Sequence, residues 1–463
     1  MTLAGGRIGD PRRNDGSATP PPGALLRGAT SAARPALPTL AARAPTPAAP
    51  DTALRAIAAE SGLERIRIVA WRDLDDPEAG GSELHAHRIA SLWAAAGIDV
   101  ELRTSSVANG PRNLERDGYR VLRHGGRYGV FVRRGVEELS RRSGRGREGR
   151  TRRAGRTGRA GRGGEGLVEI WNGMPFWSPL WFRGPRVVFL HHVHAEMWRM
   201  VLPAWMARIG EAAEKRIAPP LYRSTRVVTL SESSRAEIVD MLGLDANRIA
   251  VVPPGVEPRF SPGSRGARSP EPLVVAVGRL VPVKRFDLLL RALSHVKRSV
   301  PDLRAVIVGE GYERPRLEAL RHELAATAWV SLPGRVHADE LVDLYRRAWV
   351  AVAVSRREGW GMTLTEAGAC GTPAVASDIA GHRDAVAHGR SGLLAESEAD
   401  IGAAIARVLR DADLRARLGA GAQAHAQRLT WEAAARATLE VLAEEACWAT
   451  GDYPLSLDDG VMA

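Results

Sequence analysis

Short apolar runs alternate with longer polar stretches of helical spacing over most of the chain. The runs RIRIVAW, IDVELRTS, GYRVLRHGG, LVEIWNG, RVVFLHH, RVVTLS and IAVVPPGV have the length and β-branched content of buried strands. Helical spacing follows several of them, as in SELHAHRIASLWAAAG, GVFVRRGVEELSRR and EMWRMVLPAWMARIGEAAEKRI. Strands that alternate with helices predict a parallel sheet in an α/β domain.

A second alternation begins beyond a stretch rich in proline, glycine and serine. Its apolar runs are LVVAVGRL, RAVIVGEG, WVSLPG, WVAVAVS and TPAVASD. We therefore predict one α/β domain over residues 61–255, a linker over 256–270, and a second α/β domain over 271–430. Residues 431–463 are expected to form a last helix and a tail, with the helix a candidate to pack back on the first domain. Ligands of such domains bind at the carboxyl ends of the strands.

The positive charge of the chain is concentrated in two segments. The net charge is +12 over 463 residues, and residues 141–164 hold ten arginines, eight glycines and one glutamate. Residues 1–60 hold seven arginines and four acids, so these two segments carry the whole excess. Neither composition can build a core, and we predict a disordered leader over 1–60 and a disordered insert over 141–164.

The arginine–glycine insert raises a nucleic-acid-binding function as an alternative. The rest of the chain is neutral and lacks a basic aromatic surface, so no specific nucleic acid is expected as a partner. A loop from a helix to a strand lies at the amino ends of a parallel sheet, on the opposite side from the ligands. The insert is compatible with a peripheral contact with an anionic membrane.

Cysteine content and hydropathy bear on where the protein acts. Only Cys370 and Cys447 occur, which argues against a disulfide framework and fits a reducing compartment. No run of apolar residues is long enough to span a membrane. We expect a cytoplasmic protein, with a peripheral position at the inner membrane face as an alternative.

The stretch SRREGWGMTLTEAGACGTP carries the strongest chemical signal. A strand ends near Ser355, a glycine-flanked loop follows, and a helix is expected to begin near Thr363. The backbone N–H groups of Gly361, Met362 and Thr363 would then point out of the helix and, with its dipole, could hold a diphosphate. Glu358 and Glu366 flank this point, where they could grip sugar and ribose hydroxyls. Thr363 and Glu366 also fit a capping box, and this structural alternative stays open.

The stretch VAVGRLVPVKRFDLLLRAL adds two cations in a similar position. Arg279 follows a predicted strand, and Lys284 lies five residues later at a helix start. Two fixed cations there would neutralise a leaving nucleotide diphosphate. The alternative is that both are exposed loop charges.

Three of these stretches together resemble a known family. In order and spacing, VGRLVPVK, VIVGEGYERPRLEAL and EGWGMTLTEAGACGTP resemble the retaining glycosyltransferases of family 4. The resemblance covers the second domain nearly end to end and extends more loosely over residues 65–255. It implies the GT-B architecture, in which two Rossmann-like parallel-sheet domains face each other across a cleft.

The resemblance also implies roles for residues of the second domain. Arg279 and Lys284 would bind the donor diphosphate, Glu358 would contact the transferred sugar, and Glu366 would contact the ribose. Residues of two further loops would lie near the nucleotide base; these are Gly309, Glu310, Arg335 and Val336.

In the first domain, the stretch GGSELH resembles the glycine loop of the family. Gly80 and Gly81 would there meet donor phosphate or acceptor, although a simple tight turn would also explain them. The family places a histidine near the reacting sugar. Counting along the strand favours His192, with His191 or His194 as alternatives of register.

The sequence does not predict a metal site. The acids of DLDD at 73–76 and the three neighbouring histidines are the candidates, but the acids lie in a loop and no further ligand completes a zinc set. The family needs no divalent metal for its chemistry, so no cofactor is predicted.

The implied reaction moves a sugar from a UDP- or GDP-sugar to a hydroxyl acceptor, a glycan or a lipid-linked sugar, with retention at the anomeric carbon. The family is discussed as using a front-face substitution assisted by the leaving phosphate, so Glu358 is assigned to donor positioning and electrostatics. Synthesis of a cell-envelope glycan, polysaccharide or glycolipid is the expected role. A sugar-nucleotide epimerase of the same fold is the remaining enzymatic alternative.

Overall fold

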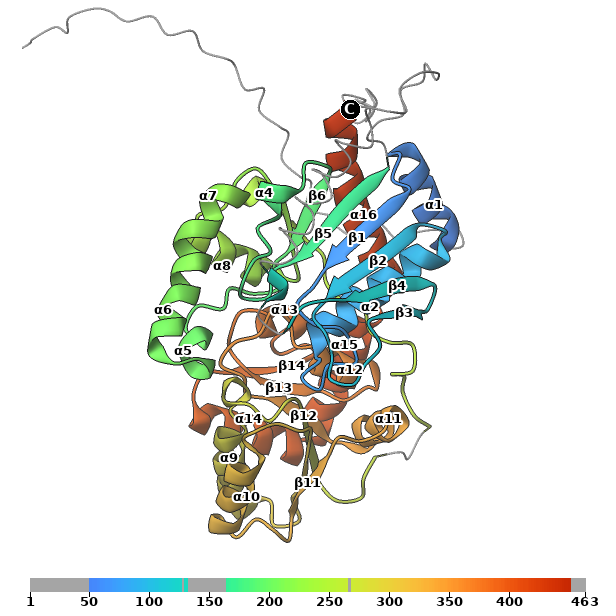
Figure 1. The fold of residues 1–463 in the computed structure, drawn as a ribbon. Coiled ribbons are helices and arrows are strands. Elements are labelled where there is room, and N and C mark those ends of the chain that lie inside the picture. Colours follow the sequence, from blue (N-terminus) through green and yellow to red (C-terminus); the bar gives the residue numbers. More distant parts are fainter. Residues whose placement is uncertain (1–49, 127–128, 132–163, 265–267, 451–463) are drawn as a thin grey trace, which may run out of the picture. The chain divides into compact units, whose positions relative to one another are not determined.

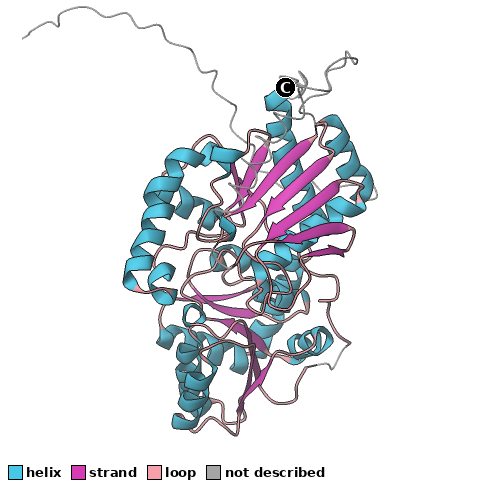
Figure 2. Cartoon of the chain, in the orientation of Figure 1, coloured by secondary structure: helices cyan, strands magenta, loops and turns pink. Residues whose placement is uncertain are grey.

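The computed structural model shows two sheets of mainly parallel strands, each flanked by helices (Figure 1; Figure 2, strands in magenta). It describes residues 50–126, 129–131, 164–264 and 268–450. The two α/β domains expected from the alternation of strands and helices are therefore present. No helix in these ranges is both long enough and apolar enough to cross a membrane.

The first sheet has the strand order β3-β4-β2-β1-β5-β6-β7-β8 over the described residues. All neighbouring strands are parallel except β3 and β4. The strands are β1 (Arg65–Val69), β2 (Asp99–Thr104), β3 (Asn113–Arg116), β4 (Tyr119–Arg123), β5 (Glu165–Ile170), β6 (Arg186–Phe189), β7 (Arg226–Thr229) and β8 (Ile249–Val251). The helices are α1 (Pro50–Glu60), α2 (Gly81–Ala95), α4 (Ser178–Trp181), α5 (Met197–Val201), α6 (Ala204–Ala212), α7 (Ala218–Tyr222) and α8 (Glu232–Leu242).

The second sheet is parallel throughout, with the order β11-β10-β9-β12-β13-β14. Its strands are β9 (Leu273–Val277), β10 (Arg304–Val308), β11 (Val330–Gly334), β12 (Val350–Ala353), β13 (Ala374–Ser377) and β14 (Gly392–Ala395). The helices that follow β9 in the chain are α9 (Phe286–Ser299), α10 (Arg314–Glu323), α11 (Ala338–Arg347), α12 (Met362–Ala369), α13 (His382–Ala385), α14 (Glu398–Arg410), α15 (Ala412–Ala426) and α16 (Trp431–Thr450).

The last helix, α16, belongs to the core of the first domain. It packs against α1, α2 and β6, and Leu439 and Leu442 are fully buried there. The indole Nε1 of Trp93 on α2 donates to the carbonyl of Ala435 at 3.0 Å. Figure 1 shows α16 (red) beside α1 and the first strands (blue). The last helix that the structure describes therefore lies in the same domain as the first one, α1.

The chain passes between the domains twice, near residues 255–256 and near residues 429–431, and these two segments lie directly against each other. The N–H of Val256 donates to the carbonyl of Leu429 at 3.0 Å. A side chain at Gly255 would meet the backbone nitrogen of Trp431 at 2.2 Å, so only glycine allows this close approach. The predicted linker also contributes to the second core, because Phe260 is buried against Tyr345.

The prediction of a disordered leader over residues 1–60 is wrong for its end. Residues 50–60 form α1, whose Leu54 and Ala58 are buried in the core that α16 completes. The apolar spacing of LRAIAA is enough to make one buried face, which the low overall hydrophobicity of the leader conceals. Residues 1–49 lie outside the described residues.

The arginine–glycine insert lies outside the described residues up to Gly164, and so does most of the helix expected over 129–142. The carbonyl of Gly164 accepts the N–H groups of Glu64 and Arg65 at 2.8 and 2.7 Å. This places the end of the insert at the amino end of β1, the edge that the sequence predicts for it.

Two elements differ from the sequence prediction for local reasons. The helix expected over 196–217 breaks at Leu202, which is extended (φ −127°, ψ 152°), because Pro203 disfavours a helical residue before it. The strand β3 was not predicted, since its sequence NLER is polar. It pairs with β4 through a turn in which Asp117 and Gly118 both have positive φ.

Replacing Gly402 with alanine is expected to stabilise the protein by about 0.5–1 kcal/mol. Gly402 is buried in α14, and an added Cβ would lie 3.7 Å from the carbonyl oxygen of Ala292 and 3.9 Å from Val296 Cγ2, in ordinary contact. The methyl group therefore fits while the helix gains propensity. Urea unfolding of the variant and the parent measures the gain, and a loss of stability would show that α14 and α9 pack more tightly than described.

Candidate active site

The carboxylate of Glu358 lies at the carboxyl end of the second sheet, in the loop between β12 and α12. It forms an ion pair with the ammonium of Lys284 and accepts a hydrogen bond from Ser355 Oγ at 3.0 Å. Burial alone would raise its pKa, but Lys284, His382 and Ser355 outweigh burial and hold the pKa at about 2. Glu358 is therefore an anion at every physiological pH.

Local backbone structure brings Lys284 to this carboxylate. Lys284 closes a 3₁₀ turn, Pro282–Lys284, after β9, and Arg285 then adopts a left-handed conformation (φ 51°) before α9 begins. The N–H of Arg356 donates to the carbonyl of Val283 at 2.7 Å. This bond fixes the turn that carries Lys284 against the loop that carries Glu358.

The start of α12 provides free backbone donors next to the pair. Gly361 precedes the helix with φ 126°, a conformation that favours glycine, and α12 begins at Met362, one residue before the predicted Thr363. No hydrogen bond within the described residues takes up the N–H groups of Gly361, Met362 and Thr363. Such a helix start attracts an anion through its N–H groups and its dipole.

The glycine loop of the first domain meets this helix start. A side chain at Gly81 would lie 3.0 Å from Met362 Sδ, and one at Gly80 would lie 3.7 Å from Arg279 Nε. Glu83 fixes the loop by accepting the N–H of Gly80 at 2.8 Å. The guanidinium of Arg279 has no hydrogen-bond or ion-pair partner in the described part of the chain. The structure thus brings both glycines, Arg279 and the start of α12 together.

The side chain of Glu366 faces α11. Its Oε2 accepts a hydrogen bond from the hydroxyl of Tyr345 at 3.3 Å. No capping box forms, since Gly361 and not Thr363 is the N-cap and Glu366 bonds no backbone N–H there. The structural alternative for Glu366 is therefore wrong. Burial raises the pKa of Glu366 to about 8. The hydrogen bond from Tyr345 lowers this pKa, and the charge of Glu257 raises it further.

Replacing Glu366 with glutamine is expected to change how stability depends on pH. Between the ordinary pKa of 4.5 and the folded pKa of about 8, the folded state holds a proton that the unfolded state releases. Stability from this group is thus complete below 4.5 and is lost as the pH rises through 8. Glutamine stays neutral, so its advantage over the parent should grow by about 3 kcal/mol from about pH 6 to about pH 9. Urea unfolding at both pH values measures this, with the exposed Glu323→Gln as control; equal pH slopes for Glu366→Gln and the parent would contradict the raised pKa.

The histidines after β6 separate into two environments. His191 points into the core of the first domain, where its Nε2 lies 3.0 Å from His85 Nδ1 and its ring stacks on Phe189. His192 stacks on His194 with ring centroids 4.9 Å apart, and its Nε2 is buried without a partner in the described residues. His191 is therefore a core residue, and His192 and His194 remain as candidates for the site.

Burial lowers the pKa of His192 to about 4, and neighbouring His191 lowers it further, while Glu358 raises it. The imidazole is therefore neutral at physiological pH. The influence of Glu358 and Lys284 on this pKa reflects their proximity to the ring. His192 thus shares one polar environment with the ion pair.

A buried carboxylate holds the histidine loop in place. Glu214, in the π-helical turn Ala213–Ile217, accepts the N–H groups of His194 and Ala195 at 2.7 and 3.0 Å. It also accepts the indole Nε1 of Trp198 at 3.0 Å. These bonds allow Ala195 its left-handed φ of 46°.

The loop that carries Glu358 is packed against the first domain. Arg357 donates to the carbonyl of Val193 at 2.9 Å and pairs with Glu237 at 2.8 Å. A side chain at Gly359 would meet the carbonyl oxygen of His191 at 2.3 Å. The hydroxyl of Ser234 donates to the carbonyl of Gly359 at 3.3 Å. Residues 356–360 are therefore held by both domains.

The two loops expected near a nucleotide base lie next to each other. The N–H of Gly309 donates to the carbonyl of Gly334 at 2.8 Å. The exposed carboxylate of Glu310 forms an ion pair with Arg314 at 2.8 Å. Arg335 is exposed and donates to the carbonyl of Pro77 in the first domain, and Val336 beside it is half-buried.

Two of the three acids of DLDD, Asp73 and Asp75, are engaged in ion pairs. Asp73 accepts two hydrogen bonds from Arg123 at 2.7 and 3.1 Å, and both side chains are buried. Asp75 pairs with Arg123 and with Arg116. The described residues include no group of three or more histidine, cysteine or acidic side chains that could hold a metal ion.

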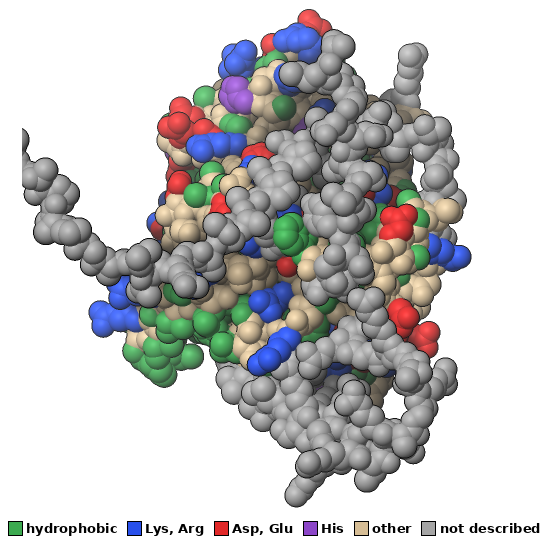
Figure 3. Space-filling model, turned by 90° about the horizontal axis from the view of Figure 1, so that it is seen from above, with side chains coloured by type: hydrophobic (Ala, Val, Ile, Leu, Met, Phe, Trp, Pro, Cys, Tyr) green, Lys and Arg blue, Asp and Glu red, His purple; other side chains and the backbone are tan. Residues whose placement is uncertain are grey.

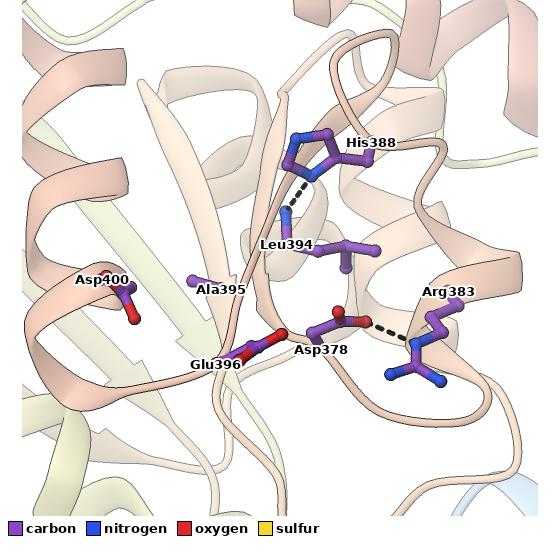
Figure 4. A pocket seen from close by; sticks show the side chains of 7 residues that line it. All are labelled: Asp378, Arg383, His388, Leu394, Ala395, Glu396 and Asp400. Atoms are coloured by element: carbon purple, nitrogen blue, oxygen red, sulfur yellow. Dashed lines mark hydrogen bonds and ion pairs between the residues drawn. The ribbon is translucent and has the colours of Figure 1, made fainter.

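A surface pocket of about 590 Å³ lies in the second domain, apart from these residues (Figure 4). It is lined by Asp378, Arg383, His388, Leu394, Ala395, Glu396 and Asp400. Asp378 accepts a hydrogen bond from Arg383 at 2.5 Å, and His388 accepts the N–H of Leu394 at 3.0 Å. Three acids and one paired arginine would repel a diphosphate, so the pocket is no candidate for a phosphorylated donor.

Two family models match adjoining parts of the chain. The model of glycosyltransferase family 4 matches residues 79–260, and the model of group 1 glycosyl transferases matches residues 259–425. The chain belongs to glycosyltransferase family 4. The resemblance expected from the sequence motifs is thereby confirmed.

Several glycosyltransferases are similar to this chain over part of their length. A D-inositol 3-phosphate glycosyltransferase of Streptomyces bingchenggensis is 37% identical over 54% of this chain and 63% of its own. A second relative of that name, from Geodermatophilus obscurus, is matched over 50% of its length. The matches thus span between half and two thirds of these relatives.

Solved structures show the fold of this family 4 chain. The sucrose-phosphate synthase of Thermosynechococcus elongatus superposes with a TM-score of 0.65 at 21% identity, covering 81% of this chain and 97% of that one. The HepE protein of Anabaena, solved in complex with UDP-glucose, gives 0.59 at 18% identity over 84% and 100%. The expected GT-B architecture is confirmed.

Several residues around the site of this family 4 chain were not predicted from the sequence. Ser355, His382 and Arg357 contact or influence Glu358 or its loop, and Tyr345 bonds Glu366. Ser355 could have been found, because a hydroxyl at the end of a strand faces the ligand edge of a parallel sheet. His382 and Tyr345 come from separate helices, and no local pattern marks them.

Proposed function

We propose that this chain is a retaining glycosyltransferase that moves a sugar from a nucleoside diphosphate donor to a hydroxyl acceptor. The observation that carries the proposal is the Lys284–Glu358 ion pair beside the N–H groups that begin α12, which no hydrogen bond from the described residues takes up. Cations and backbone donors suit a diphosphate leaving group, and a fixed carboxylate suits a sugar that becomes positively charged. Family membership supports the same assignment.

In this proposal the donor diphosphate lies between the domains' phosphate-binding groups. Arg279, which lacks a partner among the described residues, and Lys284 pair with its oxygens, while the N–H groups of Gly361, Met362 and Thr363 donate to it. Gly80 and Gly81 let the backbone of the first domain approach the phosphate or the acceptor. The ribose binds at Glu366, and the base lies near Gly309, Glu310, Arg335 and Val336.

The transfer itself exchanges two bonds at the anomeric carbon. The bond from this carbon to the diphosphate oxygen breaks, and the acceptor oxygen forms a bond on the same face. The acceptor's proton passes to the departing diphosphate oxygen. Glu358, which is ionised because its pKa is about 2, stabilises the positive sugar ring. The neutral His192 forms a hydrogen bond with a sugar hydroxyl, either as donor or as acceptor.

No cofactor is required in this proposal, because the protein's own cations neutralise the leaving diphosphate. Transfer should therefore continue in the presence of EDTA. A loss of activity that added Mg²⁺ or Mn²⁺ restores would contradict this point and would assign part of the charge to a metal.

The donor and acceptor are to be found by a ligand screen. A UDP-sugar is the first donor to test, because HepE was solved with UDP-glucose. D-inositol 3-phosphate is the first acceptor to test, because the relatives are named for it. UDP-, GDP- and ADP-sugars are tested for thermal stabilisation of the full chain, and each donor that stabilises it is then tested for transfer to glycan, lipid-linked and polyol-phosphate acceptors. At least one donor should raise Tm in the parent. The proposal fails if no nucleotide sugar stabilises the protein at millimolar concentration.

A further inference from the structure

The outer face of α6 and the π-helical turn after it carries large apolar side chains in contact with solvent. Trp205, Ile209 and Ile217 are 65%, 57% and 54% exposed. The buried positions on the side that faces the protein carry no large apolar side chain: they are Ala207 and Gly210 in α6, and Ala213 and Glu214 in the π-helical turn. An ordinary surface helix has the opposite arrangement, with large apolar residues inward.

Packing of the inner side makes this arrangement rigid. A side chain at Gly210 would lie 2.6 Å from the indole of Trp198, so the helix cannot rotate to bury Trp205 or Ile209. Glu214 points inward, where it bonds the backbone after His192. The wider π-helical turn rotates less per residue than an α-helix, which brings Ile217 back toward the line of Ile209.

The same face is positively charged. Arg208, Lys215 and Arg216 are exposed and have no ion-pair partner in the described ranges. The acids of the stretch do not compensate them, because Glu214 is buried and Glu211 is paired with Arg199 at 2.7 Å. Figure 3 shows hydrophobic side chains gathered beside lysine and arginine side chains at its lower left, the side on which α6 and α7 lie in Figure 1.

We propose that this surface, Trp205–Arg208–Ile209–Lys215–Arg216–Ile217, docks on an anionic lipid membrane. Apolar side chains that stand out from a cationic face match the interface of a bilayer with negative headgroups. Tryptophan in particular prefers that depth, where its ring is in the apolar region and its N–H is hydrated. A second copy of the chain fits less well, because a two-fold contact would bring two sets of the same cations together.

Vesicle binding of the full chain tests the proposal, with vesicles of phosphatidylcholine alone or mixed with phosphatidylglycerol. The parent should bind the mixed vesicles and bind them more weakly at high salt. Arg208→Glu/Lys215→Glu/Arg216→Glu should lower the affinity by about tenfold or more. The matched control is Arg291→Glu/Arg298→Glu/Arg410→Glu, which makes the same change of charge on exposed arginines of the second domain and should have a much smaller effect. Equal effects of the two triple variants, or no binding by the parent, would overturn the proposal.

Contact of Trp205 with lipid is measured separately, since residues 1–60 and 141–164 also carry arginines that attract anionic vesicles. Brominated phosphatidylcholine in the mixed vesicles should quench part of the tryptophan fluorescence of the parent, and Trp205→Phe should remove that part while binding is retained. Unchanged quenching in Trp205→Phe would assign the contact to another surface. Self-association of the lipid-free parent that Trp205→Ser abolishes would assign the face to a second copy, and capture of an acidic protein in place of vesicles would assign it to a protein partner.

Discussion

Replacing Lys284 with alanine is expected to lower kcat/KM for the proposed transfer about a thousandfold. Two losses combine in this variant. The donor diphosphate loses a fixed cation, and Glu358 loses the ion pair that keeps it charged and in place. Steady-state kinetics with the donor found by the ligand screen measures the loss. The matched control is Lys297→Ala, which removes a lysine from the last turn of α9, away from the site.

The pH profile of the residual activity distinguishes the two losses. Lys284 lowers the pKa of Glu358 against the opposing effect of burial, so the pKa should rise from about 2 in its absence. Residual activity of Lys284→Ala should then fall as the pH is lowered, at a pH where the parent is still fully active. In Glu358→Gln this acid limb should be absent. Parental rates in Lys284→Ala would refute the assignment of Lys284 to the diphosphate.

Replacing Gly359 with alanine is expected to lower kcat about a hundredfold and to reduce stability by about 2 kcal/mol. The new methyl group would lie 2.3 Å from the carbonyl oxygen of His191, so the loop of Glu358 and the end of β6 must move apart. Both candidate catalytic groups, Glu358 and His192, are neighbours of the displaced atoms. Kinetics and urea unfolding on the same preparation measure the two effects.

The glycine-to-alanine change at Gly402 serves as the control for this variant. It adds the same methyl group in the second domain at a place where the group fits. A Gly359→Ala protein that keeps both its activity and its stability would show that the two domains do not meet at His191 as described. Loss of stability with full activity would separate packing of the loop from its role in the site.

The sheets were predictable from the sequence because their strands are short and buried on both faces. Runs such as RIRIVAW and LVVAVGRL can only be internal strands of an α/β domain, and each forms one. The strands β3 and β14 were missed because NLER and GLLA are polar or too short to show a pattern. Helix α1 was missed because its apolar face becomes meaningful only when α16, far along the chain, covers it.

The candidate site was predictable where its residues follow a strand or begin a helix. Arg279, Lys284, Glu358 and the start of α12 all lie at such points, and the structure brings them to one edge of the second sheet. Counting along the strand favoured His192 over His191 and His194, but no local pattern shows that His191 is a core residue, since this depends on its contact with His85 of a distant helix. The pKa values of Glu358 and Glu366 likewise depend on partners that only the fold brings together.

The return of α16 to the first domain sets the order in which the protein can mature. Trp431, Leu439 and Leu442 complete the same core as Leu54, Ile66 and Trp93, which lie between 338 and 388 positions earlier. During synthesis the second domain can close as soon as its strands and helices have left the ribosome. The first domain keeps an apolar face uncovered until α16, which follows the second domain in the chain, has emerged. Chaperone dependence and sensitivity to premature termination should therefore concentrate on the half of the protein that is made first.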